Sequence, residues 1–369
     1  SIGLKKGSVV NIEKTVESIK ASIDEAKLMA GLQNLESATV GIAGNHIYCF
    51  NSSGVVPVKG KEITQNDVDR VIEAAKAVLI PSDREVIHVI PQEFKVDNTT
   101  GIRNPVGMCG SRLEVYVHIV TGKTPLIHNL VKCVELAGIE ANSVVLQPIA
   151  SSRSVLSNEE KELGVVLIDI GGGTTDIAVF YQGSIRYTEV IPLGGDQITN
   201  DIAMALRTPT LDAEDLKIQF GITKQSLVDP QIMLDVPGIG ERESRPISRQ
   251  SLAAVIEPRV EELLKFVVDS LEHSGYTQMV PSGVVLTGGT VSMPGMVELA
   301  EEVCQKHARI GLPEYNGHLK EVLRNPKYAT AIGLIREGRS QILRGQEVNQ
   351  SRPLGSVMQR VREWFMGNF

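Results

Sequence analysis

Three consecutive glycines between two acidic residues form the segment of this sequence best suited to chemistry. In VVLIDIGGGTTDIAVF, an apolar strand leads into Gly171, Gly172 and Gly173, and a second apolar strand follows. Glycines normally weaken strands, so a run of them indicates that a ligand approaches the backbone closely. The exposed amide groups, together with the hydroxyls of Thr174 and Thr175, would form a concavity that binds phosphate.

Two aspartates frame this hairpin and predict a cation beside the phosphate. Asp169 ends the first strand and Asp176 begins the second. Carboxylate oxygens are hard ligands of the kind that Mg²⁺ binds next to nucleotide phosphates. We therefore predict that both aspartates bind Mg²⁺ and that Asp169 is a candidate catalytic group. The alternative is a hairpin whose glycines only serve a tight turn, although D-x-G-G-G-T-x-D is much more constrained than a lone G-x-G-x-x-G.

Two further glycine pairs have the character of nucleotide contacts. In GVVLTGGTVSMPGM, a buried strand runs into Gly288 and Gly289 before a helix that is expected to start near Pro294. Such a pair lets a flat base or ribose lie against the backbone, although it also suits a plain turn from strand to helix. The segment PLGGDQIT adds Gly194 and Gly195 between these two sites.

A short helix between the glycine segments carries a candidate polar pair. Glu214 and Lys217 in DAEDLKIQFG are three residues apart, so both side chains project from one helical face. A shared contact made from that face is one interpretation of the pair. A solvent-exposed ion pair is the alternative.

Length and composition limit the function classes. A chain of 369 residues with 42% apolar and 22% charged residues is an ordinary globular protein with more than one core. The net charge of -7 argues against nucleic-acid binding. Four cysteines lie far apart without a C-x-x-C pair, which favours reduced thiols in the core over disulfides or zinc. They are Cys49, Cys109, Cys133 and Cys304. No apolar stretch reaches the ~18 residues that span a bilayer, so any membrane contact is expected to be peripheral.

Helical and strand patterns alternate along the chain, as in α/β proteins. Residues 11–30 have helical periodicity and residues 38–43 read as a strand. Thr64 is the expected N-cap of a helix whose apolar stripe continues to Leu79, before Pro81. Two alternating strand patterns follow, so residues from about 46 to 122 are predicted to be a small α+β insertion. The segment PLIHNLVKCVELAG then resumes the α/β pattern as a helix.

The C-terminal residues form two segments of different composition, a polar one followed by an amphipathic one. EGRSQILRGQEVNQS is polar and lacks a continuous apolar stripe, which is typical of a linker. In RPLGSVMQRVREWFMGNF, large apolar side chains then recur at helical spacing. They are Leu354, Val357, Met358, Val361, Trp364 and Phe365. This pattern predicts an amphipathic helix that lies in a membrane interface. A helix docked on the protein's own core is the alternative.

Together these segments resemble the actin-like ATPase superfamily. DIGGGTTD is similar to its second phosphate loop, LGGD to a phosphate and ribose contact, AEDLK to the adenosine-contacting helix, and LTGGT to the adenosine loop. Gln147, in LQPIASSRSVL, is similar to the connecting-helix position where actins place a water-orienting glutamine. It also suits a polar residue at the start of a helix.

Two long segments narrow the resemblance to the FtsA family of bacterial cell-division proteins. They are HVIPQEFKVDNTTGIRNPVGMCGSRLE and RQSLAAVIEPRVEELL, and the resemblance covers essentially the whole chain. It implies an actin-like two-lobed α/β fold that binds ATP and Mg²⁺, with slow or absent hydrolysis, and polymerises with further copies of itself. It also implies a peripheral position on the cytoplasmic face of the inner membrane at the division site, where the protein binds lipid.

The resemblance also implies partners. These are the C-terminal tail of the tubulin-like ring protein FtsZ and downstream division proteins, and no nucleic acid. The family binds FtsZ through the subdomain that contains Arg245, Arg249 and Arg259, which could meet an acidic tail. Ordinary surface charge is the alternative for any one of these arginines.

The resemblance further divides the chain into subdomains. These are IA (1–45, 123–165 and 311–336), the inserted IC (46–122), IIA (166–204 and 275–310), IIB (205–274), a linker (337–352) and the amphipathic helix (353–369). The family begins with a first phosphate loop of acidic-Ile-Gly-Thr type, which these residues lack, and the chain starts at Ser1. We therefore expect an N-terminal segment to be missing, and weak nucleotide binding by this chain.

Other members of the superfamily remain as alternatives. A small-molecule kinase predicts a phosphoacceptor pocket with a catalytic base, and no segment identifies one. A chaperone ATPase predicts a large peptide-binding domain after the ATPase body, where only a linker and a short helix follow. An actin-like pilus-assembly protein gives no reason for the amphipathic C-terminal helix.

Overall fold

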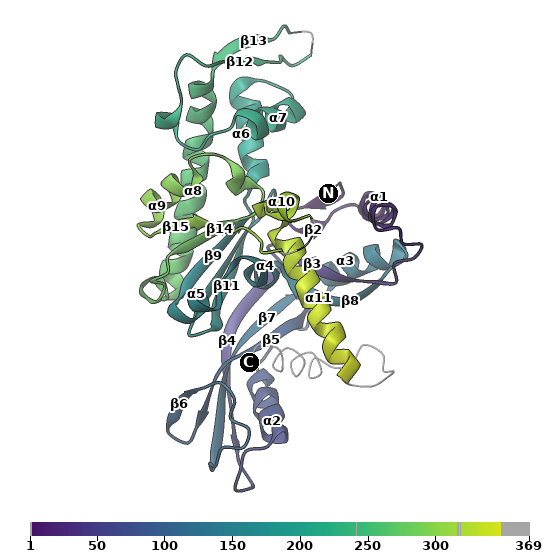
Figure 1. Ribbon diagram of the computed structural model, residues 1–369, viewed down its shortest axis with the longest axis vertical. Coiled ribbons are helices and arrows are strands. Elements are labelled where there is room, and N and C mark those ends of the chain that lie inside the picture. The colour runs from purple at the N-terminus through teal and green to yellow at the C-terminus, as the bar shows by residue number, and fades with distance from the viewer. Residues whose placement is uncertain (1, 241, 316, 318, 348–369) are drawn as a thin grey trace.

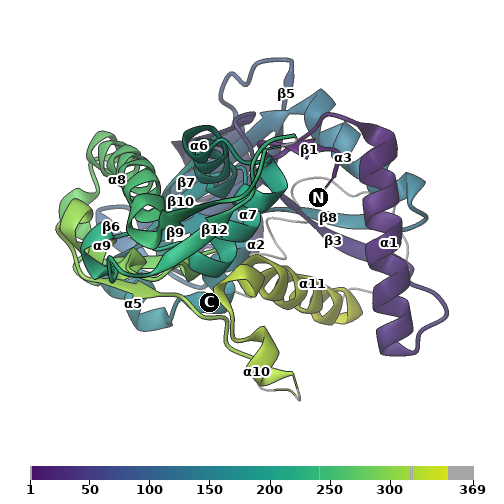
Figure 2. The same ribbon diagram turned by 90° about the horizontal axis from the view of Figure 1, so that it is seen from above.

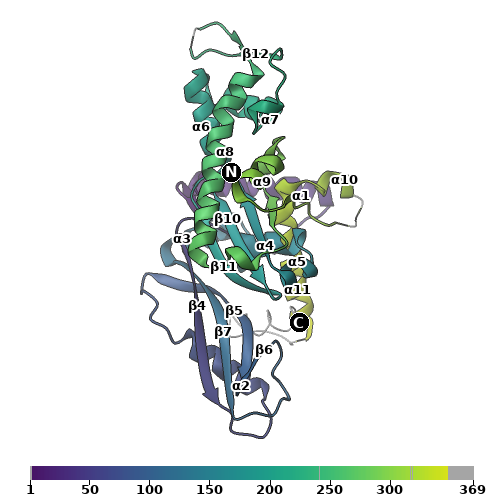
Figure 3. The ribbon, with the colours of Figure 1, turned by 90° about the vertical axis from the view of Figure 1, so that its left-hand side faces the viewer.

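The computed structural model describes residues 2–240, 242–315, 317 and 319–347, and only the backbone of residues 341–347. The molecule is elongated, with a five-stranded sheet at its centre, a helical region at one end and a second sheet at the other (Figure 1). Figure 3 shows the same two ends from the side, with α6 and β12 at one end and α2 and β6 at the other.

The central sheet has the strand order β11, β10, β9, β14 and β15. The bounds of these strands are Ser184–Ile191, Thr175–Tyr181, Val165–Ile170, Val284–Thr287 and Ala308–Ile310. β10 is antiparallel to both of its neighbours, and β14 is parallel to both of its neighbours. On β9, Val166 and Ile168 pack into one core while Val165 and Leu167 pack into another on the opposite face. A strand buried on both faces reads as a continuous apolar run, which explains the strength of its sequence signal.

Helices cover both faces of this sheet. One core includes residues of α6 (Gly195–Leu206), α7 (Thr210–Phe220), α8 (Arg249–Ser274) and α9 (Met296–Cys304). The other includes α4 (Gln147–Val155), and α5 (Asn158–Leu163) lies against β10. Beyond the sheet, α6, α7 and α8 form the helical end with a hairpin of β12 (Met233–Val236) and β13 (Arg245–Ser248).

A second group of elements lies beside the central sheet. β3 (Ser37–Ile42) and β8 (Glu140–Leu146) pair in parallel, and α1 (Ile12–Ala30) and α3 (Thr124–Leu136) pack against each other. Figure 2 shows this group, with α11 (Ala329–Glu347), on the side opposite α8 and α9. The remaining short elements have the following bounds: β1 Leu4–Lys5, β2 Ser8–Val9, α10 Lys320–Leu323, and 3₁₀ turns at Gln225–Leu227, Thr277–Met279, Thr290–Ser292 and Pro326–Tyr328.

The predicted helix over residues 11–30 is confirmed, and its ends have clear local causes. The Asn11 side chain accepts a hydrogen bond from the Lys14 amide at 2.9 Å, which caps the N-terminus. Gly31, with φ of 65°, ends the helix in the left-handed conformation that glycine favours. Ile23 is buried, but Leu28 is 84% exposed, so the expected apolar face is shorter than the sequence pattern suggests.

The predicted α+β insertion is a four-stranded antiparallel sheet with one helix. Its strand order is β4 (Ile47–Pro57), β7 (Arg112–Lys123), β5 (Arg84–Val96) and β6 (Thr99–Ile102), and α2 (Gln65–Lys76) packs on it. Thr64 caps α2 as predicted and forms a capping box with Asp67. Because α2 ends at Lys76, Leu79 lies outside the helix and is fully exposed, so its assignment to the apolar stripe was wrong.

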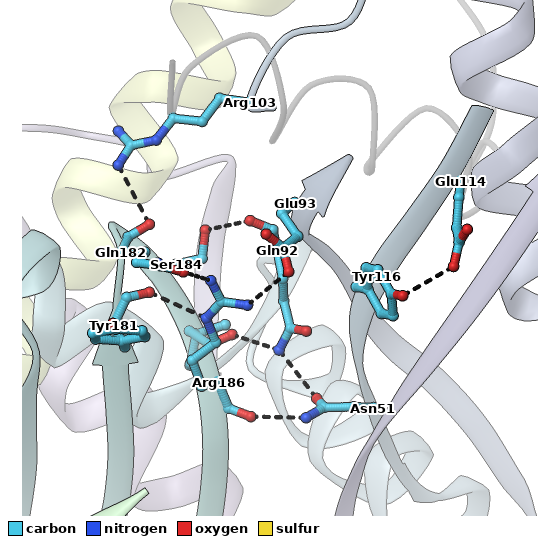
Figure 4. Close-up of polar contacts among 11 residues, drawn as sticks. Asn51, Gln92, Glu93, Arg103, Glu114, Tyr116, Tyr181, Gln182, Ser184 and Arg186 are labelled. Atoms are coloured by element: carbon cyan, nitrogen blue, oxygen red, sulfur yellow. Dashed lines mark hydrogen bonds and ion pairs between the residues drawn. The ribbon is translucent and has the colours of Figure 1, made fainter. Parts of the chain in front are cut away.

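A polar seam joins this inserted domain to β11 of the central sheet (Figure 4). Gln92 Nε2 donates to the carbonyl of Ile185 at 2.9 Å, and Ser184 Oγ donates to the backbone carbonyl of Gln92 at 2.8 Å. Asn51 donates to the carbonyl of Arg186 at 3.1 Å. The seam therefore orients the two domains through directional hydrogen bonds, beside an apolar core in which Ile90 of the inserted domain packs with Phe180 and Ile185 of the central sheet.

The structure differs from the predicted linker at 337–352, because α11 continues as a helix to Glu347. Glycines allow it to pack closely: a Cβ on Gly333 would lie 1.9 Å from the carbonyl oxygen of Ala150, and one on Gly338 would lie 2.7 Å from Thr39 Oγ1. Glu337 is buried and forms an ion pair with Arg153 at 2.8 Å. The small and polar residues that suggested a linker are therefore contact residues over this part of the segment.

All four cysteines are free thiols, in agreement with the absence of a disulfide pattern. Cys133 and Cys304 are buried and Cys49 is partly buried. Cys109 is exposed, so the expectation that all four are core residues was wrong for this one.

Candidate functional site

The triple-glycine hairpin connects β9 to β10 and presents backbone amides. The Gly171 amide closes the turn by donating to the carbonyl of Thr174 at 2.9 Å. Among the described residues, the amides of Gly172 and Gly173 have no acceptor, so both can donate to a bound anion. A Cβ on Gly172 would lie 3.0 Å from Asp196 Oδ1, and one on Gly173 would lie 3.3 Å from the backbone of Lys6. The space in front of these glycines is therefore narrow.

The PLGGD turn packs directly on this hairpin. The Gly195 amide donates to the carbonyl of Gly171 at 2.9 Å, and the Asp196 amide donates to the carbonyl of Gly172 at 2.8 Å. A Cβ on Gly194 would lie 2.6 Å from the carbonyl oxygen of Gly172, so only glycine fits there. The turn also begins α6, whose N-terminus adds a partial positive charge beside the hairpin.

The second glycine pair meets the same hairpin from the other side. Gly288 has φ of 94°, and a Cβ there would lie 2.4 Å from the carbonyl oxygen of Ile170 and 2.5 Å from Asp169 Oδ1. Gly289 precedes the 3₁₀ turn in which Thr290 Oγ1 donates to the carbonyl of Gly171 at 2.9 Å. Two segments far apart in the sequence therefore converge on this hairpin, in the way that the resemblance to the actin-like superfamily implies.

Glu214 and Lys217 tie α7 to this arrangement. Lys217 Nζ donates to Glu214 Oε2 and to Thr199 Oγ1, both at 2.7 Å, and to the carbonyl of Gly195 at 3.1 Å. Lys217 is only 8% exposed, whereas the Glu214 side chain is 41% exposed. The pair is thus not the solvent-exposed ion pair considered as an alternative, because the lysine is anchored beside the PLGGD turn.

The two aspartates are opposite each other on β9 and β10. Asp169 Oδ2 accepts hydrogen bonds from Ser151 Oγ at 2.5 Å and from Thr330 Oγ1 at 3.0 Å. Burial raises the pKa of Asp169. Burial and then the neighbouring Asp169 raise the pKa of Asp176 well above its usual range. Two adjacent buried carboxyl groups therefore repel each other unless a proton or a cation lies between them.

These carboxyl groups suit Mg²⁺. The buried Oδ1 of Asp176 has no hydrogen-bond partner, so it is available to a cation or to a water bound to one. The described part of the chain has no group of three or more His, Cys, Asp or Glu side chains that could hold a metal. Mg²⁺ does not require one, because it commonly uses one or two carboxylates together with phosphate oxygens and water.

Two predicted hydroxyl donors have other acceptors in the structure. Thr174 Oγ1 donates to Asp176 Oδ2 at 3.1 Å, and Thr175 Oγ1 donates to the carbonyl of Leu193 at 2.9 Å. Both side chains therefore hold the hairpin and its neighbours in place. Gln147 is the first residue of α4, beside Gly41 of β3, where a Cβ on the glycine would lie 3.4 Å from Gln147 Cγ. Its role in orienting water stays a prediction.

Several residues of the site carried no recognisable signal in the sequence. Ser151 and Thr330 position Asp169, Thr199 and Thr290 hold the glycine turns, and Asp196 lies against Gly172. Hydroxyl side chains are common in helices and turns, so only their spatial position distinguishes them here. Asp196 is the acidic residue of PLGGDQIT, and its position directly after two glycines was the available clue.

The three arginines predicted to bind a partner differ in availability. Arg245 donates to the carbonyl of Leu206 at 2.8 Å, and Arg249 donates to the carbonyl of Phe220 at 2.9 Å. Because a carbonyl group is uncharged, neither bond neutralises the positive charge of its arginine. Arg259 instead forms ion pairs with Asp201 and Glu262. An acidic partner would therefore have to compete with two carboxylates at Arg259.

The predicted amphipathic helix over 353–369, with its six apolar residues, lies outside the described residues. Within the part of the chain that the structure describes, no helix is both long and apolar enough to cross a membrane.

Comparison with known proteins gives full-length relatives. The family described as Cell division protein FtsA matches residues 166–333, and an SHS2 domain inserted in FTSA matches residues 44–121. The chain is 48% identical over 376 residues to cell division protein FtsA of Pseudomonas aeruginosa, covering 100% of this chain and 90% of the relative. It is 42% identical over 362 residues to the protein of the same name from Bacillus subtilis, covering 97% and 81%.

Solved structures show the fold. The PilM-PilN type IV pilus biogenesis complex superposes with a TM-score of 0.64 at 17% identity, covering 91% of this chain and 88% of that one. MreB5 of Spiroplasma citri bound to ADP superposes with a TM-score of 0.54 at 16% identity, covering 94% and 80%.

Proposed function

Because this chain belongs to the FtsA family of cell division proteins and has an actin-like fold with an inserted SHS2 domain, we propose that it binds ATP with Mg²⁺ beside the triple-glycine hairpin and tethers the FtsZ ring to the inner membrane. The kinase and chaperone alternatives have no support from these relatives. The likeness to a pilus protein is one of fold, at 17% identity.

The observation that carries the proposal is the convergence of three glycine turns beside two buried aspartates. The free amides of Gly172 and Gly173 suit phosphate oxygens, and Asp169 and Asp176 suit the cation that accompanies them. Bound Mg²⁺ would neutralise phosphate charge next to the two carboxylates. Lys217 holds the PLGGD turn against the hairpin, so the phosphate-facing amides are preorganised.

Hydrolysis is proposed to be slow or absent. Asp169, held by Ser151 and Thr330, is the candidate group for accepting a proton from the attacking water. Gln147 is the candidate for orienting that water. In this proposal the nucleotide mainly stabilises the assembled form of the protein.

Assembly is proposed to follow from the elongated shape. An actin-like body associates head to tail, and such a contact propagates into a filament because it does not close. The inserted domain and the helical region lie at opposite ends of the molecule, which places them where successive subunits would meet (Figure 3). Arg245 and Arg249 in the helical region are proposed to bind the acidic tail of FtsZ, and residues 353–369 are proposed to bind lipid on the cytoplasmic face.

The test is ATP binding by the full-length protein with the change Gly172→Val. A branched side chain there would occupy the space in front of the amides, while the structure loses little, because only the carboxylate of Asp196 must move. We expect calorimetry to show Mg²⁺-dependent ATP binding in the wild type and none in the variant. Gly60→Val is the matched control, since a Cβ there meets backbone only at 3.4 Å or more. Equal ATP affinity in Gly172→Val and wild type would refute the phosphate site.

A further inference from the structure

A small cavity of about 110 Å³ lies where α4, α5, the inserted domain and the turn between β10 and β11 meet. Ile90, Ile149 and Phe180 give it an apolar floor, and Lys161 and Asn158 lie among its polar residues. A single buried water occupies roughly 10–15 Å³ on this measure, so the space accommodates several water-sized groups. The cavity shares no lining residue with the glycine hairpin.

The charges around this cavity are unbalanced. Lys161 has no hydrogen-bond or ion-pair partner among the described residues, and its nearest aromatic contact is the Phe180 ring at 5.6 Å. Arg336, close enough to Lys161 to affect its ionisation, donates only to the carbonyls of Arg153 and Glu314. Lys161 therefore lines the cavity without a carboxylate partner among the described residues, and Arg336 adds a second positive charge nearby.

The nearby carboxylates are already paired. Glu160 forms two hydrogen bonds with Arg309, at 2.7 and 2.8 Å. Glu337 pairs with Arg153. Glu162 pairs with Arg103, which also reaches the carbonyl of Gln182 at the rim of the seam (Figure 4). Each of these three carboxylates is thus paired with an arginine, so none of them is free to neutralise the positive charge of Lys161.

We propose that this cavity binds a small oxyanion, a phosphate or carboxylate group, through Lys161 with support from the guanidinium of Arg336. Lysine and arginine are the side chains that proteins use for such groups, and a partly desolvated pair binds them more strongly than surface charges do. Burial, followed by the charges of Arg153 and Arg336, lowers the pKa of Lys161 to about 8. An oxyanion would hold the proton on this amine, so the bound state removes an electrostatic cost that the free protein carries.

The position of the cavity gives the ligand a structural effect. Lys161 lies on α5, whose backbone accepts a hydrogen bond from the Gly183 amide at 2.9 Å. Ser184, the next residue, bonds to Gln92 of the inserted domain. An anion bound at Lys161 would therefore lie beside the seam that orients the inserted domain.

The first experiment is amine labelling of the unmodified full-length protein. A succinimidyl ester is applied at pH 8 in inorganic phosphate, in citrate or in chloride at equal ionic strength, and labelling is read by mass spectrometry. We expect phosphate or citrate to protect Lys161 at least fivefold relative to chloride, while exposed Lys132 on α3 reacts equally in all three. Protection by phosphate alone identifies a phosphate site, and protection by both identifies a general oxyanion site. Equal labelling of Lys161 in all three salts overturns the proposal.

The second experiment separates this cavity from the nucleotide site. Phosphate binding is measured by calorimetry on Lys161→Met, Lys161→Gln and Gly172→Val, with Lys132→Met as the control. Loss of the buried charge should weaken binding at this cavity at least tenfold in both Lys161 variants, whereas Lys132→Met should bind phosphate as the wild type does and Gly172→Val should keep the binding that depends on Lys161. Binding that disappears in Gly172→Val and persists in Lys161→Met would assign the phosphate to the glycine hairpin and overturn the proposal, leaving the proposed function intact.

Discussion

Replacing Glu337 tests whether α11 is part of the folded body beyond residue 336. The Glu337 and Arg153 side chains are 6% and 17% exposed and lie 2.8 Å apart. Removing one partner of a buried ion pair costs about 3–5 kcal/mol, because the other charge is left in a poorly solvated place. Since Arg153 keeps some contact with water, we expect Glu337→Gln to cost at least about 2 kcal/mol.

The assay is thermal unfolding of wild type, Glu337→Gln and the control Arg339→Gln. A loss of 1 kcal/mol lowers the melting temperature of a large domain by about 2 °C, so we expect a decrease of about 4 °C or more. Arg339 is exposed on the same helix, and its replacement should change the melting temperature by less than about 1 °C. The double variant Arg153→Met with Glu337→Met should recover part of the loss, because neither charge is left unpaired. Equal melting temperatures for Glu337→Gln and Arg339→Gln would refute the buried position of Glu337 and favour the predicted linker.

Three further predictions concern protonation and the membrane. Asp176→Asn should raise the stability of the nucleotide-free protein at pH 7 and weaken Mg²⁺-dependent ATP binding. The folded-state pKa of Asp176 is raised, so ionising this carboxyl destabilises the folded protein only as the pH rises above the unfolded pKa of about 4. The stability gained by the variant should therefore vanish in unfolding curves measured near pH 4. His118 is fully buried between Asn51 and Thr188, and burial lowers its pKa to about 4. The free energy of unfolding should therefore fall by up to about 3 kcal/mol between pH 6.5 and 4, because the unfolded chain binds the proton first. In urea titrations, His118→Gln should reduce this dependence of stability on pH. Trp364→Glu should release the protein from liposomes in co-sedimentation without lowering its melting temperature, whereas Gln359→Glu, on the polar face of the predicted helix, should still pellet; a Trp364→Glu variant that pellets but melts earlier would favour a docked helix.

The glycine turns could be recognised in the sequence because close approach of the chain favours glycine. At Gly172, Gly194 and Gly288, atoms of other segments lie 3.0 Å or less from the position that a Cβ would occupy, so tertiary contacts dictate the residue type, and phosphate binding by the hairpin stays a prediction. The partners of Asp169 could not be predicted in this way. Ser151 and Thr330 are ordinary hydroxyl residues 18 and 161 positions away, and only the packing of α4 and α11 brings them to the carboxylate.

The linker predicted from residue 337 differs from the structure because the same composition suits two kinds of segment. Glu337 and Gly338 are a polar residue and a glycine at which α11 packs on α4 and β3, and composition alone does not distinguish close packing from flexibility. Thr174 and Thr175 follow the glycines as phosphate-binding threonines would, but their hydroxyls are within reach of Asp176 and Leu193 and bond there. These contacts fix the hydroxyls in the structure without a nucleotide, and a contact of Thr174 or Thr175 with phosphate stays a prediction.

The bond from Thr330 to Asp169 has a consequence for synthesis on the ribosome. Its two ends are 161 residues apart, and at about 5–20 residues per second translation needs about 8–30 s to cover that distance. For most of this interval β9, β10 and β11 are already made, but β14 and β15 are not, and Asp169 lacks one of its two hydroxyl donors. A nucleotide can therefore meet a completed site only near the end of translation, so the first three strands of the central sheet must depend on their own apolar residues until then.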